Sequence, residues 1–98
     1  MFWSQDWQKG LSAYKSGDFA TALRKWTTLA KQEDASAQNN LGQMYRRGRG
    51  VPEDYQTAAE WYTLAAEQGD AIAQCNLGVT YDKGRGVPQD CKTAVAQA

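Results

Sequence analysis

A serine and a lysine three residues apart, Ser12 and Lys15, have a spacing that could support catalysis. On a helix this spacing puts both side chains on one face, as acylating serine enzymes require. Such enzymes also need a Ser-Asp-Asn triplet, which is missing here, and a Lys-x-Gly triplet on a distant strand. The only such triplet, Lys15-Ser16-Gly17, overlaps the serine motif itself. We therefore predict no catalytic residue.

Metal and cysteine chemistry also lack the residues they need. The chain has no histidine, which removes Ser-His-Asp and Cys-His catalysis and every histidine-containing metal site. Its two cysteines, Cys75 and Cys91, form no CxxC pair, so we predict no metal and no cofactor. They are expected near the starts of two antiparallel helices, more than about 7 Å apart, and therefore as packing thiols rather than a disulfide.

The clusters of charged residues can be explained by ordinary structural roles. Glu53, Asp54 and Asp90 could act as paired carboxylates, but we predict that they lie in the first turns of helices, where negative charge is favourable. A basic edge could bind an acidic protein, phosphate or nucleic acid; its residues are Arg46, Arg47, Arg49, Lys83 and Arg85. Because 11 basic residues balance 11 acidic ones, we favour solvated loops and predict no nucleic-acid partner.

No apolar run approaches the ~20 residues that a membrane span needs. Met1-Phe2-Trp3 leads directly into polar sequence, so we expect neither a membrane span nor a signal peptide.

The chain repeats itself with a period of 36 residues. Residues 34–69 align without a gap on 70–98, and both copies contain Leu-Gly, a tyrosine and Gly-Arg-Gly-Val-Pro at the same positions. A period of this length is typical of stacked repeat arrays. We expect three units, namely 1–33, 34–69 and 70–98, the last one stopping within its second helix.

Each unit is predicted to be a pair of helices. In the last unit the first helix begins after Asp70 and ends at Gly84, and Pro88 opens the second. Glycine inside a helix costs about 1 kcal/mol relative to alanine, so Gly42 and Gly78 indicate that the second helix packs closely there. We expect the small residues Ala58 and Ala94 to lie opposite them.

The first unit has a short turn, Gly17-Asp18-Phe19, where the later units have the longer glycine-containing loop. Its pattern of Gly10, Tyr14, this turn, Ala22 and Trp26 resembles a tetratricopeptide repeat. The AxAQxxLGxxYxxGxGVPxDxxxA pattern of the later units resembles the Sel-one-like repeat, a longer-looped relative.

The resemblance implies an all-α fold, a right-handed αα-hairpin solenoid of about five to six helices. It also implies an adaptor that holds a protein or peptide in its concave groove. Many bacterial relatives are exported or act at the cell envelope, so a periplasmic or secreted location is suspected.

Carrying over the concave positions of tetratricopeptide repeats predicts the groove residues. The predicted groove residues are Ser36, Asn39, Gln43, Arg46, Arg47, Val79, Asp82 and Lys83. The same carry-over adds Ile72 and Cys75 in the last unit and Trp7, Leu11 and Tyr14 in the first. The polar middle set could hydrogen-bond a peptide backbone or carboxylate, or could simply face water.

Two aromatic residues, Trp3 and Trp7, are expected to precede the first unit. They would either cap the end of the array or offer an anchor to a partner, and we favour capping. Trp26 and Trp61 are expected in the core.

Three functional hypotheses remain open. The first is a protein-interaction module that uses the groove. The second is a self-assembling spacer, since the apolar end at Thr93–Ala98 lacks a covering neighbour and could complete itself on another copy. The third is hydrolysis of β-lactams or cell-wall fragments, as suggested for cysteine-rich relatives, although this chain lacks their paired cysteines.

Overall fold

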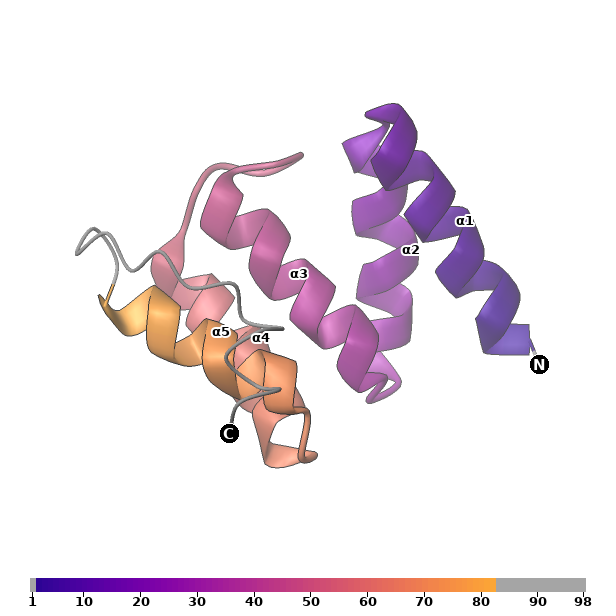
Figure 1. The fold of residues 1–98 in the computed structure, drawn as a ribbon. Coiled ribbons are helices and arrows are strands. Elements are labelled where there is room, and N and C mark those ends of the chain that lie inside the picture. The colour runs from indigo at the N-terminus through magenta and orange to yellow at the C-terminus, as the bar shows by residue number, and fades with distance from the viewer. Residues whose placement is uncertain (1, 83–98) are drawn as a thin grey trace.

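The computed structural model describes the backbone of residues 2–82 and the side chains of residues 6–80. This part of the chain holds five helices and no strand. The helices are α1 (Phe2–Ser16), α2 (Phe19–Lys31), α3 (Ala35–Arg47), α4 (Tyr55–Glu67) and α5 (Ala71–Asp82). Each helix packs against the next one along the chain, which gives two hairpins followed by the first helix of a third (Figure 1). The prediction of an all-α helical repeat is confirmed.

An aspartate begins each of the last four helices. The carboxylates of Asp18, Asp34, Asp54 and Asp70 each accept a hydrogen bond from the backbone N–H three residues later, at 3.0–3.2 Å. Such a cap satisfies one of the N–H groups that a helix start leaves without a partner. Asp18 and Asp54, like Asp34 and Asp70, are one 36-residue period apart, so the repeat fixes where the helices begin.

The start of α4 corrects one expectation. Asp54 is the cap that precedes the helix, so neither Asp54 nor Glu53 lies in the first turn. In this unit Pro52 lies two residues before the cap, in the loop. The corresponding Pro88 and Asp90 lie outside the described residues.

A repeated glutamine links successive hairpins. Gln38 Nε2 donates to the backbone oxygen of Ala30 at 3.1 Å, and Gln74 Nε2 donates to that of Ala66 at 3.3 Å. Both oxygens lie at the end of the preceding helix, where carbonyl groups lack partners within the helix. The glutamine of the repeat therefore joins each first helix to the hairpin before it.

Glycine allows the two helices of a hairpin to approach closely. A Cβ at Gly42 would lie 2.5 Å from Cε1 of Tyr62, and a Cβ at Gly10 would meet the indole of Trp26. The predicted close approach is therefore present, but the residue opposite Gly42 is the aromatic Tyr62 rather than Ala58. Trp26 and Tyr62 are 36 residues apart and both buried, so each hairpin uses the same glycine–aromatic contact.

The first helix is longer than expected. α1 begins at Phe2, so Trp3 and Trp7 lie within the first hairpin rather than before it. The ring centroid of Trp7 lies 5.3 Å from that of Trp26. Because a helix continues through these residues, Trp7 takes the same place in α1 that Asn39 takes in α3, three residues before the glycine.

Candidate binding groove

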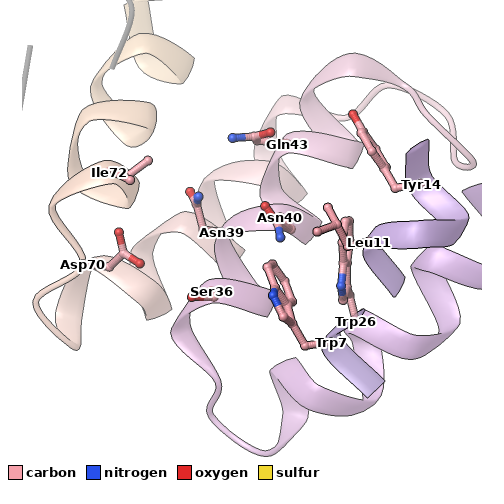
Figure 2. Close-up of a pocket in the computed structure, with 10 residues that line it drawn as sticks. All are labelled: Trp7, Leu11, Tyr14, Trp26, Ser36, Asn39, Asn40, Gln43, Asp70 and Ile72. Carbon is pink, nitrogen blue, oxygen red and sulfur yellow. The ribbon is translucent and has the colours of Figure 1, made fainter. Parts of the chain in front are cut away.

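A hollow of about 410 Å³ lies along the first helices of the three units. Its walls come from α1, α2, α3 and the beginning of α5, and Figure 2 shows the α3 side chains between those of α1 and α5. It is lined by Trp7, Leu11, Tyr14, Trp26, Ser36, Asn39, Asn40, Gln43, Asp70 and Ile72.

The wall on the α1 side is aromatic and apolar. Trp7 and Tyr14 both contact the ring of Trp26, with centroid distances of 5.3 and 5.5 Å, and Leu11 lies between them in α1. Trp26 is 2% exposed, and its Nε1 is the one buried side-chain nitrogen or oxygen among residues 6–80 that lacks a hydrogen-bond partner. That nitrogen faces the helix backbone at Gly10, so Trp26 offers a ligand apolar contact rather than a donor.

The floor on α3 is rich in side-chain amides. Asn39 is 8% exposed, and its Oδ1 accepts a hydrogen bond from Nδ2 of the buried Asn76 in α5 at 2.9 Å. That bond fixes the orientation of the Asn39 amide. Asn40 and Gln43 are half-buried, and Ser36 is exposed at the mouth. Carboxamides carry both donors and an acceptor, so this floor suits the N–H and C=O groups of a peptide backbone.

Among the described side chains, Asp70 is the only charged one that lines the groove. Its Oδ1 already accepts from the backbone N–H of Ala73, as the cap of α5. Arg46 points elsewhere, since its Nε donates to the hydroxyl of Tyr62 at 3.3 Å. Within residues 6–80, the groove therefore has an acidic residue at one end and no cation in its lining.

Three of the eight predicted groove residues line the hollow together, namely Ser36, Asn39 and Gln43. Arg46 and Arg47 do not, because they lie on the side of α3 near the hairpin partner and the solvent. Val79 is half-buried on α5, outside the lining. Asp82 ends α5 but its side chain is not described, and Lys83 lies outside the described residues.

The carried-over residues of the outer units divide in the same way. Trp7, Leu11, Tyr14 and Ile72 line the hollow, whereas Cys75 is a half-buried free thiol outside the lining. Cys91 lies outside the described residues. Asn40 was missed, although an asparagine at the same place in both later units, Asn40 and Asn76, was a signal in the sequence.

Other surfaces offer less chemistry. Ser12 and Lys15 are both exposed on α1, and neither has the desolvated environment of an activated nucleophile and base. Among the described residues, no group of three or more His, Cys, Asp or Glu side chains could hold a metal ion. The described helices include none that is long and apolar enough to cross a membrane. A second hollow lies between α2 and α4, where Leu64 is 45% exposed.

Comparison with known families agrees with the internal repeat. A family model described as "Sel1 repeat" matches residues 35–70 and 71–96, which together make up more than half of the chain. No curated protein matches the chain. Sel1 repeats are generally protein–protein interaction modules and are typically not catalytic. The matched segments contain α3, α4 and α5, and on this basis the chain belongs to the Sel1 repeat family.

Proposed function

We propose that this protein is a non-enzymatic interaction module that binds a segment of a partner protein in the groove along α1, α3 and α5. The observation that carries the proposal is the composition of the groove. An aromatic wall on α1 faces a floor of side-chain amides on α3, and both belong to one hollow of about 410 Å³. Protein interfaces are enriched in such aromatic anchors, and the amides can satisfy the polar backbone of a bound segment.

The scaffold supports this use of the groove. Trp26, Leu41 and Tyr62 are each at most 2% exposed, so the helices that present the lining rest on a packed core. A rigid surface loses little conformational entropy when a partner binds. The partner, in contrast, can be a flexible segment that becomes ordered in the groove.

The proposal can be tested by filling the groove without disturbing the core. Ser36→Trp adds a large side chain at an exposed position that lines the hollow. Glu60→Trp adds the same side chain at an exposed position of α4 that lines neither hollow, and is the matched control. We expect a partner protein retained by the immobilised wild type to be retained by Glu60→Trp and lost with Ser36→Trp. Retention of every partner by Ser36→Trp would refute the groove.

The self-assembly hypothesis rests on Thr93–Ala98, which lie outside the described residues. Light scattering over a concentration series tests it directly, since a mass that does not change with concentration would count against it. Self-assembly through Thr93–Ala98 would be compatible with binding in the groove. The described lining of the groove comes from α1, α2, α3 and the beginning of α5.

A further inference from the structure

Among the described side chains, the hydrogen bond between amides of α3 and α5 has no counterpart between α1 and α3. Asn76 lies two residues before Gly78 in α5 and bonds to Asn39, which lies three residues before Gly42 in α3. Asn40 is the residue of α3 that corresponds to Asn76. Its expected acceptor is the residue three positions before Gly10, and that residue is Trp7.

Trp7 cannot take the role of Asn39. An indole has one N–H donor and no acceptor, so it gives the Asn40 amide nothing to donate to. Within residues 6–80 the Asn40 side chain makes no hydrogen bond, although it is half-buried and lines the groove. Figure 2 shows it beside Leu11 and Trp7. The Asn40 amide is not among the buried atoms that lack a partner, so it is open to solvent from the groove and available to a ligand.

A second donor lies next to it. The oxygen of the Asn39 amide is occupied by Asn76, and its Nδ2, which is not among the buried unpaired atoms, makes no hydrogen bond to a described residue. Asn39 is more than nine-tenths buried and lines the same hollow. Two neighbouring amides, one of them locked by a buried bond, therefore present N–H groups to an occupant of the groove.

Charge restricts what the occupant can be. Among the described residues, the lining contains the carboxylate of Asp70 and no cation. A carboxylate or phosphate bound at these residues would meet neutral donors and a like charge, which is unfavourable. A backbone carbonyl carries no net charge and accepts from an amide N–H without this cost.

We infer that the groove recognises an extended, non-acidic peptide segment, with a backbone carbonyl bound by the amides of Asn40 and Asn39 and an apolar side chain packed on Trp7 and Leu11. This inference rests on the proposed function and specifies the chemistry of the partner. Recognition depends on an internal stretch of the partner rather than on a terminal carboxylate.

The test uses pools of nine-residue peptides that carry one leucine or phenylalanine and span about 30 Å when extended. Acetylated and amidated peptides are prepared with neutral, acidic or basic flanks, and a fourth pool keeps a free carboxylate. The full chain is compared with Asn40→Asp, which keeps the shape of the side chain but replaces its donor with a charged acceptor. Gln56→Glu makes the same change at an exposed position of α4 outside both hollows and is the control.

We expect the capped neutral peptides to bind the wild type. Asn40→Asp should weaken their affinity by about tenfold or more, and Gln56→Glu should leave it unchanged. Circular dichroism of each variant confirms that it is folded. A requirement for acidic flanks, for basic flanks or for a free carboxylate would overturn the inference, and so would equal binding by Asn40→Asp. If Ser36→Trp removes a protein partner while no neutral peptide binds, this inference fails and the groove function stands. If Ser36→Trp removes nothing, the function itself fails.

Discussion

Gly42 lies directly under the ring of Tyr62, so close that a Cβ there would be 2.5 Å from Cε1 of the ring. Tyr62 is fully buried, and its hydroxyl accepts a hydrogen bond from Nε of Arg46. This contact sets the separation of α3 and α4, and thus the position of α3 in the groove.

The first prediction concerns this contact. Gly42→Ala should reduce the free energy of unfolding by about 1–3 kcal/mol, because overpacking outweighs the better helix propensity of alanine. A Cβ at Gly10 would likewise meet the indole of Trp26, so Gly10→Ala should cost a similar amount. Urea denaturation of both variants measures this, and a Gly42→Ala protein as stable as the wild type would contradict it.

The second prediction concerns Arg49. Its guanidinium lies 5.7 Å from the ring centroids of both Tyr14 and Phe19, and its Nη1 donates to the hydroxyl of Tyr14 at 3.1 Å. This arginine therefore holds the long loop of the second unit against the first hairpin. Arg49→Ala should cost about 1 kcal/mol by thermal or urea unfolding.

Two further variants separate this role from a general effect of charge. Arg47→Ala removes an exposed arginine from the same region and should change stability by less than about 0.5 kcal/mol. Arg49→Lys keeps the charge but lacks the planar group, so it should be intermediate. An Arg49→Ala protein as stable as the wild type would show that the loop is held by other contacts.

The third prediction concerns the buried amide pair. Asn39→Ala leaves Nδ2 of Asn76 buried without its acceptor and should cost about 1–3 kcal/mol. Asn76→Ala should have a similar effect. The double variant should cost less than the sum of the two, because the second change removes the group that the first left unsatisfied. Additive losses in a double-mutant cycle would mean that the pair does not couple α3 to α5.

The fourth prediction concerns acid. The hydroxyl and then the backbone N–H of Thr21 lower the pKa of Asp18 from its ordinary 3.8, and the backbone N–H and then the hydroxyl of Thr57 lower that of Asp54. Both carboxyls are thus more acidic in the folded state. The stability they contribute is fully present above the unfolded pKa near 3.8 and is lost as pH falls through the lower folded values.

Replacing both caps with asparagine should make the melting temperature fall less steeply as the pH drops below 3.8. Asparagine still accepts the capping hydrogen bond but does not titrate. Glu60→Gln removes an exposed carboxylate that caps no helix and should leave the acid dependence of the wild type intact. An unchanged pH profile in the double cap variant would mean that other carboxyls control the acid unfolding.

Much of the fold was predictable because it depends on spacing. The 36-residue period, the capping aspartates and the glycine-ended loops are local signals, and α3 and α4 lie within the residues where the repeat predicts them. The residue opposite Gly42 was not predictable. Ala58 and Tyr62 lie one turn apart on the same face of α4. Which of them faces Gly42 depends on how α3 and α4 cross, and that is decided by packing rather than by helical spacing.

The groove was predictable in part, through the family resemblance. The concave positions carried over from tetratricopeptide repeats include Ser36, Asn39 and Gln43, and these three do line the hollow. Arg46 continues the same face, yet its side chain turns to the hydroxyl of Tyr62. The hydrogen bond between the side-chain amides of Asn39 and Asn76 joins residues that are not at equivalent positions of the repeat. An alignment of the repeat units therefore does not reveal it.

The most direct test of the groove is photo-cross-linking in cells that make the protein. A photoreactive amino acid at Gln43, in the groove, is compared with one at Gln56, on the exposed side of α4. The account predicts a partner peptide cross-linked from position 43 and absent from position 56, with the attached segment identified by mass spectrometry. Cross-links from position 56 alone would contradict it, because they would show that the partner binds the other side of the helices.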